Sequence, residues 1–289
     1  MQRQLELDQV ATSVDVPIVG TDSQARRILA FGWYGGKYSH LEWLLPLLPA
    51  AHHYCEPFGG SAAVLINREP SPVETFNDID GELVNFFRVL RNQTARLAKA
   101  LALTPFSREE FSNAINQDRS RLSDLERARR FFVRARQVRT GLAQTASLGR
   151  WANCRNTSRA GMSGAVSRWL GSVKHLPEIA DRLIRVQIEN RPALEVIRLY
   201  DSPDTLFYLD PPYPHASRGD SKAYQYEMTD EQHAMLADFL NNIQGKAAIS
   251  GYRCGLLDSL YSGWRRIEAP HRVCHSVKKM RQEVLWTNY

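Results

Sequence analysis

The sequence predicts an α/β protein with a mixed seven-stranded sheet and an inserted basic segment. Short runs of β-branched and aromatic residues alternate with amphipathic stretches, which is the pattern of a sheet covered by helices. The last two runs are expected to close the sheet as an antiparallel pair. The insertion is indicated by charge, because residues 127–177 contain ten arginines and Lys174 but neither Asp nor Glu.

The strands are predicted from short apolar runs bounded by turn residues. Residues 205–209 read Thr-Leu-Phe-Tyr-Leu, a composition typical of an interior strand. The predicted strands lie near residues 54 and 75 and at 184–189, 205–210, 246–251, 264–268 and 282–287.

The helices are predicted from apolar residues that recur on one face. Residues 107–110 and 229–232 resemble capping boxes. Residues 141–164 are rich in Gly, Ser, Asn and Thr, and we expect them to form a loop that becomes ordered on a partner. The predicted helices lie at 41–48, 83–101, 104–125, 124–139, 193–200, 229–241 and 255–261.

Length and composition set limits on the class of protein. A chain of 289 residues can form one domain of about 200–250 residues with an insertion, or two domains. No apolar run approaches the roughly 20 residues that span a bilayer, and residues 1–20 lack a secretory signal pattern. We therefore expect a cytoplasmic protein that does not bind membranes.

The cysteines predict no metal site. They show neither a C-x-x-C motif nor a His spacing suited to zinc, and free thiols in a reducing cytoplasm are expected. The four are Cys55, Cys154, Cys254 and Cys274.

The basicity of the chain belongs to residues 127–177. The remaining residues hold 26 of the 37 basic side chains and all 31 acids, a net charge of −5. An arginine-rich segment interleaved with Phe131, Phe132, Trp151 and Trp169 suits a phosphate backbone and stacked bases. A solvated helix face, or a patch for an acidic protein, is the alternative. The candidate DNA-binding residues are Arg127, Arg130, Arg134, Arg136, Arg139, Arg150, Arg155 and Arg159.

The strand at 205–209 leads into a rigid polar turn. Asp210 places a carboxylate at the end of the strand, and Pro211 and Pro212 stiffen the backbone and lack N–H donors. Tyr213 is expected to place a ring at the rim. Two acceptors beside a stacking plane can receive a planar group that carries an amine, such as a nucleobase edge. An ordinary proline-rich turn is the alternative.

Two further stretches suit a nucleotide-like cofactor. Residues 54–67 have the form of a strand, a glycine loop and a helix, although they match neither G-x-G-x-x-G nor a Walker motif. A second predicted strand, at 73–77, is followed by acidic residues that lie about 20 residues after the first stretch. α/β nucleotide sites place a carboxylate for ribose hydroxyls at this position. A plain turn remains the alternative for the first stretch.

Four motifs in register carry a resemblance to a known family. They are Trp-Tyr-Gly-Gly-Lys at 33–37, Glu-Pro-Phe-Gly-Gly at 56–60, Asn-Asp-Ile-Asp at 77–80 and Asp-Pro-Pro-Tyr at 210–213. Together they resemble the Dam-type, alpha-group DNA adenine methyltransferases, which use S-adenosylmethionine (AdoMet). The similarity covers about residues 28–100 and 180–289. In that family the target-recognition region precedes Asp-Pro-Pro-Tyr, and the acid-free segment lies at that place.

The resemblance implies a Rossmann-like AdoMet-dependent methyltransferase fold with an inserted, mainly helical target-recognition region. The implied organisation is a tail at 1–22, a catalytic domain at 23–103 and 180–289, and a recognition insertion at 104–179. The implied reaction is site-specific transfer of a methyl group to N6 of an adenine flipped out of double-stranded DNA, as in restriction–modification. A prokaryotic or phage-infected cell and a monomer are expected.

The resemblance also implies roles for residues. Asp78 would hold the ribose, and the 33–37 and 56–60 motifs would line the methionine end of the AdoMet site. Two positions depart from the family. Ala62 replaces a glycine, and Pro192 replaces the acid that contacts the cofactor's adenine, for which Glu189 or Asn190 could substitute. The candidate cofactor residues are Trp33, Lys37, Glu56, Pro57, Phe58, Gly59, Gly60, Asp78, Asn190 and Asp210.

The expected mechanism needs no metal, because AdoMet is an already activated sulfonium. The Asp210 carboxylate and the Pro211 carbonyl would accept the two amine hydrogens, and Tyr213 would stack on the base. Asp210, Pro211, Pro212 and Tyr213 are therefore the candidate catalytic residues.

Several alternatives remain open at this point. They are a cytosine exocyclic-amine methyltransferase, an enzyme that methylates RNA or protein, and a catalytically silent DNA-binding protein. The loop at 214–227 is either a mobile wall that touches DNA or an ordinary surface loop. Lys278, Lys279 and Arg281 are further candidates for phosphate contacts.

Overall fold

The computed structural model describes residues 27–115, 121–218, 224–270 and 282–289. The expectations for the N-terminal tail, for Cys274 and for the basic residues at 278–281 lie outside the described residues.

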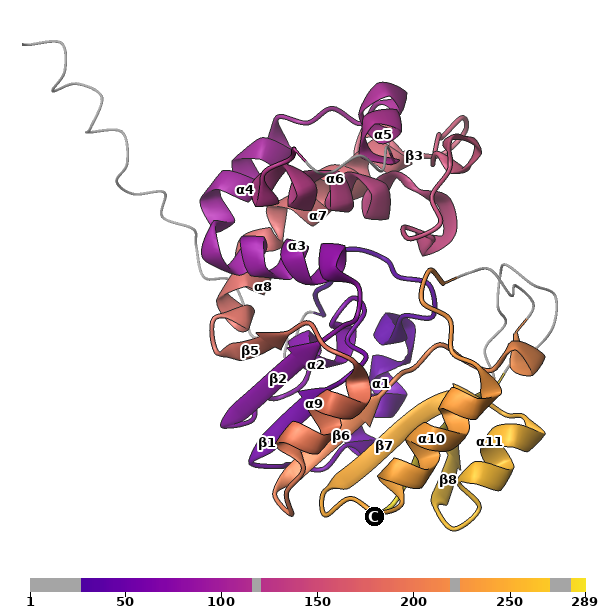
Figure 1. Ribbon diagram of the computed structural model, residues 1–289. Coiled ribbons are helices and arrows are strands. Elements are labelled where there is room, and N and C mark those ends of the chain that lie inside the picture. Colours follow the sequence, from indigo (N-terminus) through magenta and orange to yellow (C-terminus); the bar gives the residue numbers. More distant parts are fainter. Residues whose placement is uncertain (1–26, 116–120, 219–223, 271–281) are drawn as a thin grey trace, which may run out of the picture.

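A mixed seven-stranded sheet forms the centre of the molecule, as predicted (Figure 1). Its order is β5-β2-β1-β6-β7-β9-β8, and neighbouring strands are parallel except where β9 pairs with β7 and with β8. The strands are β1 (His53–Glu56), β2 (Val73–Asn77), β5 (Val186–Glu189), β6 (Thr205–Leu209), β7 (Lys246–Tyr252), β8 (Arg265–Glu268) and β9 (Glu283–Thr287).

The order of the strands brings the predicted motifs together. β1 lies between β2 and β6, with His53 opposite both Val73 and Thr205. The chain leaves β1 for one side and later returns on the other, which makes a topological switch point. Because these strands are parallel, the segments that follow them meet at one edge of the sheet.

Helices cover both faces of the sheet because both faces carry apolar side chains, as β6 shows. Its successive side chains point to opposite faces, so Leu206 and Tyr208 enter one apolar cluster while Phe207 and Leu209 enter the other. The helices are α1 (Leu41–Leu44), α2 (Ala63–Asn67), α3 (Gly81–Asn92), α4 (Thr94–Ala102), α5 (Arg108–Ile115), α6 (Asp124–Gln137), α7 (Gly164–Lys174), α8 (Leu176–Leu183), α9 (Ala193–Tyr200), α10 (Asp230–Leu240) and α11 (Gly255–Leu260). In the described part of the chain, no helix is long and apolar enough to cross a membrane.

The predicted insertion packs on the sheet domain through aromatic side chains. Phe86 of α3 stacks on Phe132 of α6, with ring centroids 5.6 Å apart. Phe131, Phe132 and Trp169 are buried in the same apolar cluster as Phe86. This corrects the expectation that these three rings are available to stacked bases, because they lie on the faces of their helices that pack in the core. Trp151 is half-buried beneath the guanidinium of Arg108.

Three predicted boundaries are wrong. The helix expected at 83–101 is two helices, because the backbone at Gln93 (φ −137°, ψ 38°) leaves the helical region. Within the described residues, the helix expected at 104–125 is limited to α5 and the start of α6. The loop expected at 141–164 contains a hairpin of β3 (Ser158–Arg159) and β4 (Met162–Ser163). The sequence interpretation did not include α7 and α8, although α7 buries Trp169 and Val173.

Candidate active site

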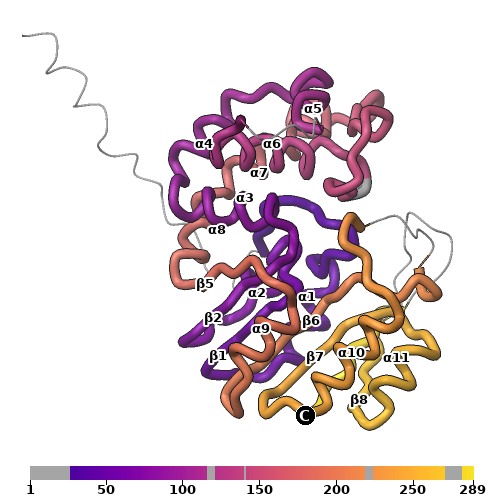
Figure 2. Tube along the Cα trace, in the orientation of Figure 1, coloured from indigo at the N-terminus to yellow at the C-terminus, as the bar shows by residue number. Residues whose placement is uncertain are grey.

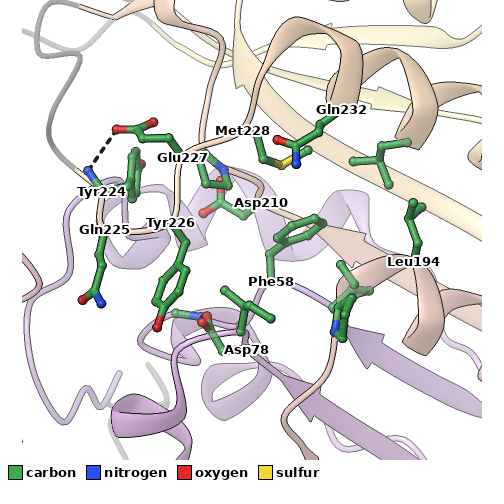
Figure 3. Close-up of a pocket in the computed structure, with 18 of the residues that line it drawn as sticks. Phe58, Asp78, Leu194, Asp210, Tyr224, Gln225, Tyr226, Glu227, Met228 and Gln232 are labelled. Atoms are coloured by element: carbon green, nitrogen blue, oxygen red, sulfur yellow. Dashed lines mark hydrogen bonds between the residues drawn. The ribbon is translucent and has the colours of Figure 1, made fainter.

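A cavity of about 670 Å³ lies where β1, β2 and β6 end. This volume falls within the roughly 300–1,000 Å³ typical of ligand sites. Figure 3 shows Phe58, Asp78 and Asp210 among its lining residues, with Tyr224 and Tyr226 on one side and Leu194 on the other. Eight of the residues predicted for the site line this cavity: Trp33, Pro57, Phe58, Gly59, Gly60, Asp78, Asp210 and Pro212.

The glycine loop after β1 is tightly packed. A Cβ atom on Gly59 would lie 2.1 Å from the buried ring of Phe76, and one on Gly60 would lie 3.0 Å from the Trp33 indole. Gly60 also has a φ of 50°, which favours glycine. Glycine is therefore required at position 59 by the packing of Phe76, and at position 60 by the packing of Trp33 and by the backbone conformation. Ala62, which departs from the family pattern, adopts the same left-handed region (φ 54°).

Asp78 is fixed by the backbone around it. Its Oδ2 accepts a hydrogen bond from the Gly60 N–H (2.9 Å), and its Oδ1 accepts one from the Asp80 N–H (2.9 Å). Burial raises the pKa of Asp78 to about 6, and the backbone donors oppose part of that rise. The carboxylate is thus held in place on the cavity wall.

Asp210 is held by one of its two oxygens. Lys37 Nζ donates to Oδ1 at 2.6 Å, and Ser250 Oγ donates to the same atom at 3.1 Å. Among the described residues, none donates a hydrogen bond to Oδ2. Asp210 is 19% exposed and lines the same cavity as the Phe58–Gly60 loop. The ion pair with Lys37 therefore orients the carboxylate without removing it from the cavity.

Lys37 and Glu283 form a buried charge network behind Asp210. Lys37 Nζ also contacts Glu283 Oε1 at 3.4 Å and donates to the Gly35 carbonyl at 2.7 Å. Burial alone would lower the pKa of Lys37, but the Asp210 and Glu283 carboxylates outweigh it and raise this pKa. Burial raises the pKa of Glu283, and the Lys37 charge opposes the rise.

Tyr213 does not stand at the rim, which corrects the expectation from the sequence. Its side chain is 4% exposed, and its hydroxyl donates to Glu283. Lys37 Nζ lies 5.0 Å from the centre of its ring, and Tyr252 packs edge-on against the ring. The ring therefore supports the Lys37 network in this conformation.

Three predicted cofactor residues lie outside the cavity lining. Lys37 stands behind Asp210, and Glu56 is buried at the end of β1, where the Tyr54 hydroxyl donates to it at 2.7 Å. Burial raises the pKa of Glu56 to about 8. Asn190 Nδ2 donates to the Asp78 carbonyl at 2.7 Å and supports the Asp78 turn. Glu189, the alternative adenine contact, accepts from the Tyr200 hydroxyl at 2.8 Å.

Several residues outside the lists of candidate catalytic and cofactor residues also line the cavity. Tyr34 packs edge-on against Tyr224 at 5.3 Å, and both rings face the cavity. Ile79 is 44% exposed and lies beside Asp78. Gln144 of the insertion donates to Asp80 Oδ2 at 3.0 Å and accepts from the Gln225 N–H at 3.3 Å. An isolated Gln in a polar stretch gives no indication of such a bridge.

The eight candidate arginines occupy different environments. Arg127 pairs with Glu82, and Arg130 pairs with Glu126. Arg134 is 6% exposed and donates to the Ala114 carbonyl, which corrects the expectation that its side chain is available to DNA. Of the remaining five, Arg136 and Arg139 line a smaller cavity, Arg150 donates to the Thr145 carbonyl, and Arg155 and Arg159 are exposed.

The sheet order, the glycine loop after β1, the acid after β2 and Asp-Pro-Pro-Tyr after β6 define a Rossmann-like methyltransferase. The family model of the D12 class N6 adenine-specific DNA methyltransferases matches residues 33–273, and the chain belongs to this family. It is also similar to the Type II methyltransferase M1.LlaDCHI of Lactococcus lactis subsp. cremoris, with 24% identity over 285 residues that cover 89% of this chain and 94% of that protein. The resemblance drawn from the four motifs is thereby confirmed, and the enzyme is an adenine-specific DNA methyltransferase.

Within the residues that the structure describes, no group of three His, Cys, Asp or Glu side chains is placed to hold a metal ion.

Proposed function

We propose that the enzyme binds AdoMet in the cavity and uses Asp210 to receive an adenine everted from double-stranded DNA. The observation that carries this proposal is the asymmetry of Asp210. One oxygen is fixed by Lys37 and Ser250, while the other is free of hydrogen bonds from the described residues, on a side chain that lines the cavity.

The residues of the cavity fit AdoMet. Gly59 and Gly60 line the cavity without side chains, and the Asp78 carboxylate is suited to ribose hydroxyls. Trp33 and Phe58 contribute aromatic side chains to the lining, and Ile79, Pro192 and Leu194 contribute apolar ones. When bound, AdoMet supplies a methyl group already activated on a sulfonium.

The acceptor base would enter beside Asp210. Adenine's exocyclic nitrogen is conjugated into its ring and is a poor nucleophile. Asp210 Oδ2 and the Pro211 carbonyl would accept its two hydrogens and favour a more tetrahedral nitrogen with its lone pair directed at the methyl group. Such acceptors stabilise most when positive charge develops on the nitrogen in the transition state.

Base eversion costs a few kcal/mol, and stacking on an aromatic ring returns about 1–3 kcal/mol. With Tyr213 buried, the rings that line the cavity are the candidates for this contact. Apart from Trp33 and Phe58, which are assigned to the cofactor, they are Tyr34, Tyr224 and Tyr226.

A labelled-methyl assay tests the proposal. The protein is incubated with methyl-labelled AdoMet and, separately, with duplex DNA, single-stranded DNA and RNA, and the products are digested to nucleosides. N6-methyladenine from the duplex is expected, and mapping its positions gives the recognition site. Label in N4-methylcytosine, in RNA alone or in no product would contradict the proposal.

Substitution of Asp210 tests the acceptor role. Asp210→Ala should abolish transfer but bind AdoMet as the wild type does, measured by calorimetry. Asp181→Ala removes an exposed carboxylate on α8 and serves as the control. Normal turnover by Asp210→Ala would exclude this mechanism.

A further inference from the structure

A second cavity of about 400 Å³ lies in the insertion, between the end of α6 and α7. Arg136, Arg139 and Arg168 line it together with the polar side chains of Asn153 and Thr157. No Asp or Glu is among the described residues that line it. Three cationic side chains therefore share one cavity that contains no counter-charge from its own walls.

Arg136 is the inner residue of this cavity. Its Nη2 donates to the Arg168 carbonyl at 3.0 Å, but its buried Nε has no hydrogen-bond partner among the described residues. Burial and the nearby Arg168 charge lower the pKa of Arg136 to about 10. Arg139 donates to the neutral amide of Asn153. An unpaired buried N–H and repulsion between cations both favour binding of an anion here.

Other arginines on α6 do not share this environment. Arg127 pairs with Glu82, and Arg129 and Arg130 pair with Glu126. Each of these three arginines therefore has a carboxylate partner within the fold. By contrast, no carboxylate is among the described residues that line the cavity of Arg136 and Arg168.

The position of this cavity relates it to the active site. Gly32 lines it, while Trp33 and Tyr34 line the active-site cavity. Gly141 (φ 71°) packs so closely on this stretch that a Cβ there would lie 3.1 Å from the Trp33 carbonyl carbon. The stretch before α1, indigo in Figure 2, runs between the sheet layer and the helical layer. A single segment of backbone thus separates the two cavities.

We propose that this second cavity binds one backbone phosphate of the target DNA, held by Arg136 and Arg168 with Arg139 at its side. This inference rests on the proposed function. Guanidinium groups bind phosphate oxygens in a fixed, often bidentate geometry. Phosphate contacts set the register of a protein on DNA. A phosphate held one backbone segment away from Trp33 and Tyr34 would fix the strand that delivers the everted base.

The first test measures DNA affinity against salt concentration, with a duplex that the wild-type enzyme methylates. Loss of one phosphate contact should reduce the slope of log K against log salt by about 0.9. Arg136→Gln and Arg168→Gln should each show this reduced slope and about tenfold weaker binding at low salt, with unchanged AdoMet affinity. Arg265→Gln, an exposed arginine on β8, is the matched control and should keep the wild-type slope.

A methylphosphonate scan identifies the phosphate. Duplexes that each carry one neutral methylphosphonate are compared, and the wild type should lose affinity at the contacted position. The Arg168 side chain is exposed, and the fold of the Arg168→Gln variant is checked by circular dichroism. This variant should lose no affinity when the methylphosphonate stands at that position, and should respond as the wild type does at the others. Wild-type slopes, or equal sensitivity of wild type and variant at every position, would overturn the assignment. If inorganic phosphate at millimolar concentration competes in the wild type but no methylphosphonate has an effect, DNA is not the source of the bound phosphate and the proposal fails.

Alkylation of Cys154 separates this inference from the proposed function. Cys154 lines the second cavity, and hydrogen bonding with Thr157 lowers its pKa to about 7, so iodoacetamide should modify it near neutral pH. Peptide mass analysis should show that duplex DNA slows this modification in the wild type but not in Arg168→Gln. Protection without any methyl transfer would retain the phosphate site and refute the proposed function. Methyl transfer to DNA without protection of Cys154 would retain the proposed function and refute the phosphate site.

Discussion

Lys37 and Asp210, which are 173 positions apart in the sequence, form an ion pair with 2.6 Å between Nζ and Oδ1. The pair fixes the orientation of the carboxylate at the end of β6. It also places a buried cation between Asp210 and Glu283. The geometry of the acceptor therefore depends on a residue that does not line the cavity.

Lys37→Met should reduce the rate of methyl transfer by about 100-fold, because a misplaced Asp210 loses its alignment with the amine. The variant should also be less stable, since it leaves Glu283 buried without its cationic partner. Steady-state kinetics and thermal unfolding measure the two effects. The double variant Lys37→Met/Glu283→Gln should recover stability but not activity, and Lys246→Met, at an exposed position of β7, is the control. A Lys37→Met enzyme with the wild-type rate would contradict the positioning role.

AdoMet affinity should fall as the pH drops through about 6. The ionised Asp78 is the better acceptor for ribose hydroxyls, and its pKa is raised to about 6 by burial. Below this value the dissociation constant should rise about tenfold per pH unit. Asp78→Asn should bind more weakly at pH 8 and lack this inflection, which calorimetry between pH 5 and 8 can check. Matching pH profiles for the two proteins would argue against a ribose contact.

The stability of the protein should decrease as the pH rises from about 4 to about 8 through the ionisation of Glu56. Its folded-state pKa of about 8 lies above the roughly 4.3 of an unfolded chain, so the folded state holds the proton more tightly in this window. The contribution to the free energy of unfolding is present below the unfolded pKa and falls by about 1 kcal/mol per pH unit until the folded pKa is passed. Glu56→Gln should remove this component, measured by urea unfolding at pH 5, 6.5 and 8. Glu69→Gln, at an exposed carboxyl, should keep the wild-type dependence, and an unaltered slope in Glu56→Gln would refute the assignment.

The same substitution at two glycines should have opposite effects. Gly59→Ala would place a methyl group 2.1 Å from the ring of Phe76 and should destabilise the protein by about 1–3 kcal/mol. Gly171→Ala, inside α7 with nothing within 4 Å of the new Cβ, should stabilise it by about 0.5–1 kcal/mol. Thermal unfolding of both variants checks the signs. A stable Gly59→Ala protein would show that the glycine loop can move away from Phe76.

Local pattern was sufficient to predict the strands and the place of Asp210. A short apolar run followed by Asp-Pro-Pro is sufficient to predict a strand and the turn after it. Parallel strands then bring the segments at their ends together. The orientation of Tyr213 could not be predicted, because it depends on Glu283, 70 positions later in the chain.

The same limit applies to the basic insertion. Its charge was evident in the sequence, but the burial of Arg134 and Phe132 depends on α5 and α3. Helix α7 was missed because its glycines and serines are typical of loops, while its stability comes from the packing of Trp169.

The contact between Phe86 and Phe132 bears on the exchange of sequence specificity between relatives. Helix α6 carries half of an aromatic interface, and the other half belongs to α3, which precedes the predicted insertion. A chimera that grafts only residues 104–179 would therefore join two mismatched halves. A graft that begins at Gly81 would transfer the interface intact, and with it the angle at which the helices of the predicted insertion are presented.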